Sequence, residues 1–190
     1  MTDFSQAGAS PATSALAPNF PKRIFITGAS GYVGRNLVRH FVAAGTSVVG
    51  LSRTDPGADL IRELGATPVI GDIVSTDLAE AMKGCDALVH AAANPDHGRS
   101  TEAQQRTNLE GTRRVFDAAR RAGIGRAVHI SSESVLADGR PIVNASEARP
   151  FPRRPAGGYS RSKADAEQTA LSFSSLDLSV MVVRPRVVWG

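Results

Sequence analysis

Short apolar runs alternate with longer amphipathic stretches along most of the chain. Runs this short and this continuously apolar are typical of strands buried on both faces of a sheet. The stretches between them carry apolar residues at helical spacing, and the two at 33–44 and about 101–122 are each followed by a glycine suited to end a helix, Gly45 and Gly123. The alternation predicts right-handed crossovers, and therefore an α/β fold in which a doubly wound parallel sheet lies between two layers of helices. The expected strands are residues 23–27, 47–51, 67–70, 87–91, 127–130 and 178–183.

The same pattern defines the domain organisation. Residues 1–21 are rich in alanine, serine, threonine and proline and show no apolar periodicity, which predicts a flexible N-terminal tail. Residues 22–190 are enough for one sizeable core and too few for two domains. Residues 138–158 interrupt the alternation with a long segment rich in proline and glycine, and irregular segments of that length are usually functional.

Composition narrows the classes of partner. The net charge is +4, but the basic residues are nearly all arginines spread along the chain, so we expect no nucleic-acid partner and favour an anionic small-molecule substrate. The single cysteine, Cys85, excludes an internal disulfide and a cysteine-based zinc site, and we expect no metal. There is no leader-like segment and no long apolar run, so we expect a cytoplasmic protein without a membrane partner.

Three glycines follow the first expected strand and open the first expected helix. In such a turn Gly28 permits the sharp bend, Gly31 lets the backbone approach a pyrophosphate, and Gly34 lets helix and strand pack closely. The amides at the helix start then hold the phosphate charge. The turn predicts a dinucleotide site, which would also involve Ser30, Tyr32 and Val33.

Cofactor choice is read at the end of the second strand. The position at which a carboxylate would bind the ribose diol of NAD is Ser52, and Arg53 follows it. Serine and arginine can bind a 2′-phosphate, so NADP is preferred, with NAD as the alternative. At the end of the third strand, Asp72 contacts adenine or caps a turn, and the residues leave both open.

Tyr159 and Lys163 stand four residues apart, which places them on one face of a helix. An ammonium beside a phenol favours the ionised form of the phenol and so lowers its pKa toward the range useful for proton transfer. His90 and His129 indicate nothing beyond their places in strands.

These patterns occur together in the order and spacing of a known family. From Lys22 onward the chain resembles the extended short-chain dehydrogenases/reductases, in particular the branch of 3β-hydroxysteroid dehydrogenase-like enzymes and nucleotide-sugar epimerases and dehydratases. The segments that carry the resemblance are Thr27-Gly28-x-x-Gly31-x-x-Gly34, Gly71-Asp72-Ile73, His90-Ala91-Ala92-Ala93, Asn108-x-x-Gly111-Thr112, Ser131-Ser132 ahead of Val135, Tyr159-x-x-x-Lys163 and Arg184-Pro185.

The resemblance implies a Rossmann-type domain, a nicotinamide cofactor and hydride transfer at a secondary alcohol or ketone. It makes Tyr159 the acid/base, Lys163 its activator and ribose ligand, and Ser132 the hydroxyl that binds the reacting oxygen, with Ser131 and Ser134 as close rivals. Asn108 helps to hold the Lys163 side of the site or bonds locally. The remaining cofactor positions that it implies are Ile73, Ala91, Ala92, Ala93 and Arg184.

The family pattern also leaves alternatives. The family pattern usually continues well past Arg184-Pro185, so we expect the C-terminal substrate region to be absent here. Residues 187–189 would then expose apolar surface. The chain could pair with another chain, and a homodimer is one alternative. The first alternative function is a nucleotide-sugar epimerase or dehydratase. A dehydratase would carry acidic residues beside the catalytic serine, and here Glu133 is acidic but Ser134 is not. An epimerase keeps NAD bound throughout, and Ser52-Arg53 argues mildly against that. The second is a dinucleotide-binding protein without catalysis.

Overall fold

All the predicted strands are present in the computed structural model, which describes residues 21–95 and 102–188. The tail predicted at residues 1–21 lies outside this range except for its last residue. The strands are β1 (Arg23–Thr27), β2 (Ser47–Ser52), β3 (Thr67–Ile70), β4 (Ala87–His90), β5 (Arg126–Ile130) and β6 (Ser179–Val183).

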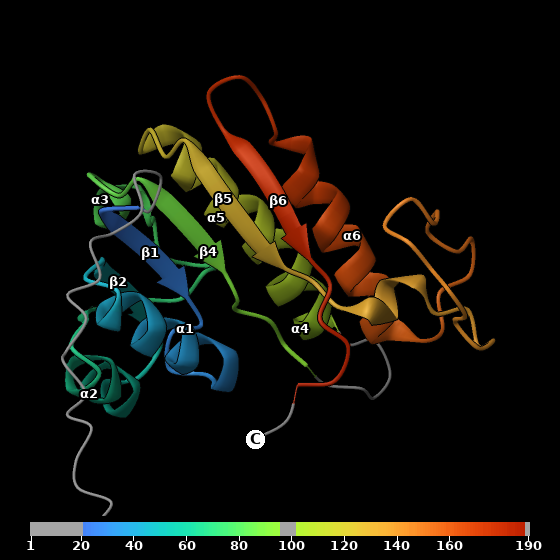
Figure 1. The fold of residues 1–190 in the computed structure, drawn as a ribbon, viewed down its shortest axis with the longest axis horizontal. Helices are drawn as coiled ribbons and strands as arrows, with labels where there is room; N and C mark the ends of the chain where they lie inside the picture. The colour runs from blue at the N-terminus through green and yellow to red at the C-terminus, as the bar shows by residue number, and fades with distance from the viewer. Residues whose placement is uncertain (1–20, 96–101, 189–190) are drawn as a thin grey trace, which may run out of the picture.

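The strands form one parallel sheet in the order β3-β2-β1-β4-β5-β6. The chain first builds outward from β1 to β3, then crosses back to β4 and builds the other way. The predicted doubly wound, Rossmann-type sheet is therefore confirmed. In Figure 1 the arrowheads of β1, β4, β5 and β6 point toward the same edge of the sheet. The direction in which successive strands are added to the sheet reverses between β1 and β4. Such a reversal is where open α/β sheets bind ligands.

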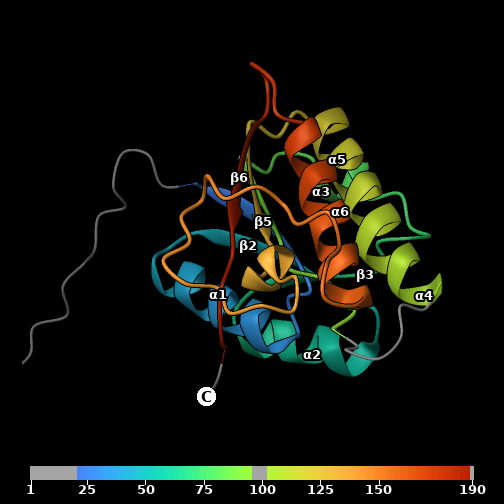
Figure 2. The ribbon, with the colours of Figure 1, turned by 90° about the vertical axis from the view of Figure 1, so that its right-hand side faces the viewer.

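Alternation along β1 joins the sheet to both helical layers. Ile24 and Ile26 pack with residues of α1 (Tyr32–Ala43) and α2 (Asp55–Glu63), whereas Phe25 between them packs toward the opposite layer. That second layer contains α3 (Ala79–Met82), α5 (Gly111–Arg121) and α6 (Gly158–Ser172). Figure 2 shows α3, α5 and α6 together on one side of the sheet. Strands buried on both faces explain why their sequences read as continuous apolar runs.

The helix predicted from about residue 101 to 122 is not continuous. It consists of α4 (Glu102–Gln105), the π-helical turn η1 (Arg106–Glu110) and α5, and a short 3₁₀ turn, η2 (Glu133–Leu136), follows β5. The wider π turn shifts the residues that face inward, and at its end Gly111 lies so close to Ile73 that a Cβ atom would overlap that side chain. Apolar spacing did not predict this insertion, because a single π turn adds only one residue to a pattern that otherwise has helical spacing.

Two histidines belong to the core between the sheet and α5. His90 of β4 and His129 of β5 are register partners with ring centroids 5.3 Å apart, and Phe116 of α5 lies edge-on to both. Burial, aided by the charge of Lys163, lowers the pKa of His90 to about 3. Burial also holds the pKa of His129 well below its usual value, with smaller effects from His90 and Lys163. Both imidazoles are therefore neutral at pH 7.

Among residues 21–95 and 102–188, no helix combines the length and the apolar character that crossing a membrane requires.

The neutral histidines predict acid destabilisation. As the pH falls below about 6.5, both imidazoles are protonated in the unfolded chain, whereas in the folded chain His90 stays neutral down to pH about 3. The free energy of unfolding should therefore fall with pH, approaching about 1.4 kcal/mol per pH unit for each histidine. Urea unfolding at pH 6 and pH 5 measures this slope. His129→Phe should reduce it by about 1.4 kcal/mol per pH unit, and an unchanged slope would contradict the assignment.

Candidate active site

The turn after β1 is closed by backbone contacts that admit only glycine. Gly28 has a φ of +67°, and a Cβ atom on it would lie 2.8 Å from the amide nitrogen of Ala92. The Gly31 amide donates a hydrogen bond of 3.0 Å to the Gly28 carbonyl. A Cβ atom on Gly34 would overlap that same carbonyl oxygen. The turn thus brings β1, α1 and the segment after β4 into direct backbone contact.

A cavity of about 390 Å³ opens at this turn, at the edge where the strands end. It is lined by Gly28, Ser30, Gly31, Leu51, Ser52, Arg53, Asp72, Ile73, Ala91, Ala92, Ala93, Asn94, Pro95 and Thr107. Ten of these are positions that the sequence predicts for the cofactor, and Leu51, Asn94, Pro95 and Thr107 are not among them.

The start of α1 suits a pyrophosphate at this cavity. No side chain caps the start of this helix, because its N-cap residue is Gly31. Val33 and Gly34 lie in the first turn, where amides have no acceptor within the helix. Tyr32, Val33 and Gly34 do not line the cavity themselves. The glycine contacts, the cavity and this helix end together fit a dinucleotide.

The predicted ribose corner separates into two different side chains. Ser52 is buried, and its hydroxyl donates to the carbonyl of Thr54 at 3.1 Å and accepts from the Thr54 amide, so it shapes the turn into α2. Arg53 is exposed at the cavity wall. Asp72 caps its own turn, because its Oδ1 accepts a hydrogen bond of 2.7 Å from the Val74 amide, while it also lines the cavity. Arg53 therefore places an exposed guanidinium at this wall of the cavity.

The predicted catalytic residues come together near the ends of β5 and α6. Tyr159 and Lys163 lie one turn apart in α6, and Tyr159 shares a hydrogen bond with Ser132, which precedes η2. Burial raises the pKa of Tyr159, and the hydrogen bond with Ser132 lowers it only in part. This net direction is opposite to the one expected from an adjacent ammonium.

Lys163 is buried and donates a hydrogen bond of 2.8 Å to the carbonyl of Ile130, the last residue of β5. Burial lowers the pKa of Lys163 to about 8, although the nearby Glu167 carboxylate raises it. Its ammonium therefore faces the strand end, which accounts for the absence of the expected downward effect on the pKa of Tyr159.

The two rival serines are placed differently from Ser132. The Ser131 hydroxyl donates to Glu167 at 2.6 Å, and the Ser134 hydroxyl oxygen is buried without a hydrogen-bond partner among the described residues. Ser132 alone of the three is placed against Tyr159.

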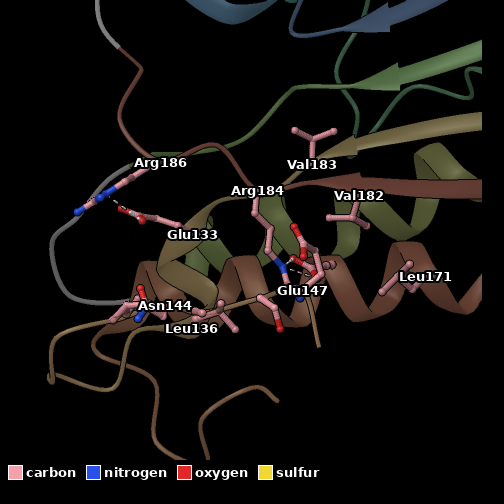
Figure 3. A pocket seen from close by; sticks show the side chains of 13 residues that line it. Glu133, Leu136, Asn144, Glu147, Leu171, Val182, Val183, Arg184 and Arg186 are labelled. Carbon is pink, nitrogen blue, oxygen red and sulfur yellow. Dashed lines mark hydrogen bonds and ion pairs between the residues drawn. The ribbon is translucent and has the colours of Figure 1, made fainter. Parts of the chain in front are cut away.

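Arg184 lies outside the cofactor cavity, contrary to its predicted place there. Its guanidinium binds the buried Glu167 through Nε and Nη2, the latter at 2.6 Å, and lies over the ring of Phe151. Figure 3 shows Arg184 reaching toward α6 from the segment after β6. The buried carboxylate draws the guanidinium because an unpaired charge there would be costly.

A second cavity, of about 860 Å³, lies on this outer side of the site. Its wall includes Leu136, Val183 and Arg184, and Glu133 and Arg186 form an ion pair at 3.3 Å beside it (Figure 3). Val187 and Val188 are exposed, as predicted, whereas residue 189 lies outside the described residues.

Asn108 in η1 joins three parts of the site. Its side-chain oxygen accepts from the Asn94 amide at 2.7 Å, and its side-chain nitrogen donates to the Asn94 carbonyl at 3.1 Å and to the Ser162 hydroxyl at 3.0 Å. Of the two alternatives, the structure favours the one in which Asn108 holds α6, although the contact is with Ser162 and not with Lys163. Local bonding is excluded as its main role by these distant partners.

His90, to which the sequence reasoning assigned no role, is hydrogen-bonded at both ring nitrogens. Thr27 lies 2.7 Å from Nδ1 and Thr112 lies 2.9 Å from Nε2. The overlooked signal was that all three are polar residues at buried positions, and Thr27 and His90 are register partners at the ends of β1 and β4.

Within residues 21–95 and 102–188, no three histidine, cysteine, aspartate or glutamate side chains gather into a group that could hold a metal ion.

The glycine contacts predict a strong effect of a single methyl group. Gly34→Ala should lower the free energy of unfolding by about 1–3 kcal/mol, because its Cβ must displace the Gly28 carbonyl. Gly125→Ala is the matched control, since its Cβ would lie 3.9 Å from the nearest atom, the Asp177 carbonyl oxygen. Urea unfolding of the two variants measures the difference, and equal stabilities would contradict the close packing of the turn.

Comparisons with known proteins agree with this geometry. Residues 24–190 match the model of the NAD dependent epimerase/dehydratase family. The chain is 47% identical over 170 residues to the 4-hydroxy-2-methyl-3-oxo-4-farnesyl-3,4-dihydroquinoline-1-oxide ketoreductase of Stigmatella aurantiaca, covering 88% of this chain and 51% of the relative. It is 32% identical to the sterol-4-alpha-carboxylate 3-dehydrogenase, decarboxylating, of Dictyostelium discoideum, covering 89% and 54%.

Among solved structures, the dTDP-glucose 4,6-dehydratase DesIV from Streptomyces venezuelae, with NAD and TYD bound, has a TM-score of 0.75. It is 27% identical and is covered over 85% of this chain and 55% of its own. The chain spans about half the length of the curated relatives it matches. The family match over nearly the whole chain and the ketoreductase identity confirm the resemblance: this chain belongs to the NAD dependent epimerase/dehydratase family of extended short-chain dehydrogenases/reductases.

Proposed function

We propose that this chain forms the cofactor-binding and catalytic part of an NAD(P)-dependent oxidoreductase that transfers a hydride to or from a secondary alcohol or ketone. The observation that carries the proposal is the hydrogen bond between Ser132 and Tyr159, with Lys163 buried one turn further along α6. A phenol and a hydroxyl that meet where strands end are suited to hold one substrate oxygen between them.

The bound nicotinamide supplies or accepts the hydride. The chain's own residues handle the oxygen and its proton. In the direction of reduction, Tyr159 donates its proton to the carbonyl oxygen, and Ser132 donates a hydrogen bond that stabilises the developing negative charge. The phenol is protonated at neutral pH at its ordinary pKa, and burial, which raises the pKa of Tyr159, leaves it so.

Lys163 contributes a positive charge beneath this pair. With a pKa of about 8 it remains mostly an ammonium at pH 7, held by the Ile130 carbonyl. Because this ammonium is directed at the Ile130 carbonyl, it does not lower the pKa of Tyr159. It also has donors to spare for the hydroxyls of a ribose.

The substrate class rests on the relatives. The Stigmatella aurantiaca relative is named a ketoreductase and the Dictyostelium discoideum relative a sterol-4-alpha-carboxylate 3-dehydrogenase. These names support a ketone or secondary alcohol on a hydrophobic, sterol-like small molecule. A homodimer remains a prediction.

An epimerase or dehydratase is the second candidate. The dehydratase relative with NAD bound favours it, as does the carboxylate of Glu133 beside Ser132. In this chain, however, Glu133 pairs with Arg186 at 3.3 Å. The hydrogen-bonded Ser132 and Tyr159 argue against the third candidate, a protein that binds the dinucleotide without catalysis.

Arg53 predicts a preference for NADP over NAD. Calorimetric titrations with NADPH and NADH should give tighter binding of NADPH, and Arg53→Ala should weaken NADPH binding about tenfold or more, the loss of a charge-assisted hydrogen bond, while sparing NADH. Arg62→Ala is the control, since Arg62 pairs with Asp59 on the exposed side of α2. Equal losses for NADPH and NADH would rule out recognition of the 2′-phosphate by Arg53.

The catalytic pair predicts large losses of rate. Tyr159→Phe should lower the rate of hydride transfer to a ketone by about 10²–10⁴-fold and Ser132→Ala by about 10²–10³-fold, because each removes a group that acts on the reacting oxygen. Ser134→Ala should change the rate little, because that hydroxyl has no hydrogen-bond partner among the described residues. Loss of NADPH absorbance under substrate saturation measures all three, and a Tyr159→Phe rate within tenfold of the parent excludes the acid/base role.

A further inference from the structure

A continuous chain of hydrogen bonds runs beneath the cofactor cavity. It begins at the cavity wall, where the Ala92 amide donates to the Thr27 hydroxyl at 3.2 Å. That hydroxyl lies 2.7 Å from His90 Nδ1, and the other ring nitrogen lies 2.9 Å from the Thr112 hydroxyl. The Thr112 hydroxyl in turn lies 2.6 Å from the main-chain carbonyl oxygen of Asn108. The side chains of Thr27, His90 and Thr112 are all buried, so the groups have only one another as partners.

The far end of this hydrogen-bond chain determines which group donates and which accepts in each of its hydrogen bonds. A carbonyl oxygen can only accept, so the Thr112 hydroxyl donates to Asn108. Its oxygen must then accept from His90, which places the imidazole proton on Nε2. Nδ1 is left as an acceptor and takes the proton of the Thr27 hydroxyl, whose oxygen accepts from Ala92. The chain therefore fits one neutral tautomer and neither the other tautomer nor the imidazolium.

Both ends of the chain hold the same stretch of cavity wall. At one end Thr27 binds the amide of Ala92, whose backbone packs against Gly28. At the other end the Asn108 side chain binds both the amide and the carbonyl of Asn94. The wall segment 92–94 has no strand partner, because β4 ends at His90. Thr27 and the Asn108 side chain therefore both hold this segment, and His90 bonds to Thr27 directly and, through Thr112, to the main-chain carbonyl of Asn108.

The surroundings of His90 keep it neutral. His129 faces it from β5 and Lys163 from α6, and Phe116 packs on it from α5. The two titratable groups carry positive charge when protonated, and each opposes a second positive charge on His90.

We propose that His90 is a positioning residue for the cofactor cavity: its neutral imidazole, protonated on Nε2, connects Thr27 with Thr112 and Asn108 and thereby fixes wall segment 92–94. It touches neither substrate nor cofactor and acts through the wall. The proposal rests on the proposed function only in naming a dinucleotide as the ligand of the cavity.

The tautomer is tested by nitrogen-15 NMR of the ring nitrogens of the labelled chain. The expected spectrum shows the proton of His90 on Nε2, with no titration between pH 5 and pH 9. A proton on Nδ1, or an imidazolium in that range, would overturn the proposed chain.

The positioning role is tested by hydrogen exchange in His90→Phe. The amides of Ala92 and Asn94 should exchange about tenfold faster or more relative to the Ile26 amide in the middle of β1. His129→Phe is the matched control, because it makes the same replacement in the same buried layer but loses no hydrogen bond among the described residues. A merely structural role would speed all three amides alike, and that result, or equal effects in the two variants, would overturn the proposal.

Thr112→Val breaks the same chain one link further on with almost no change of shape, and it should speed the exchange of Ala92 and Asn94 in the same way even if His90→Phe does not fold. Calorimetric titration with NADPH should show about tenfold weaker binding for these variants and no change for His129→Phe. If the parent chain binds neither NADPH nor NADH, the proposed function fails, whereas the NMR and exchange results still decide the role of His90.

Discussion

The site depends on pairing the polar groups that are buried where the parallel strands end. Thr27, His90 and Ser131 terminate or directly follow strands, and each is almost inaccessible to water. An unpaired hydroxyl or imidazole in such a place costs a few kcal/mol, and an unpaired charge costs more. His90 pairs with Thr112 of α5 and Ser131 pairs with Glu167 of α6, so the requirement for pairing helps to fix how these two helices sit on the sheet.

Two networks meet this requirement on either side of Tyr159. One runs from Thr27 through His90 and Thr112 to Asn108, which also binds Ser162 at the start of α6. The other joins Ser131 and Arg184 through Glu167, two turns further along the same helix. Because α6 is held by both, the helix that carries the phenol and the ammonium is tied to the ends of the sheet and to the cavity wall.

The two networks differ in charge: one is neutral, and the other contains a buried ion pair. The first is neutral and adjoins the cavity at which the phosphates of a dinucleotide would lie. The second contains a buried carboxylate that is matched by Arg184 and that also raises the pKa of Lys163 against the effect of burial. Arg184 therefore neutralises Glu167, and it is not among the residues that line the cofactor cavity.

Local signals determined much of this protein. The apolar runs predicted the strands, because β1, β2 and β4 are buried on both faces. The spacing of Gly28, Gly31 and Gly34 predicted the turn, because steric limits on the backbone act over a few residues. The same holds for Tyr159 and Lys163, whose shared helix face follows from helical geometry alone.

The tertiary structure decided what those residues touch. It directed Lys163 to the Ile130 carbonyl, brought Ser132 to Tyr159, and paired Arg184 with Glu167. It also gave His90 two partners that are 63 and 22 residues away along the chain. The sequence by itself determined where the chain turns and which faces are buried, since steric fit and periodicity are local. Only the tertiary structure decided which buried polar groups meet, because burial makes pairing obligatory without specifying the partner.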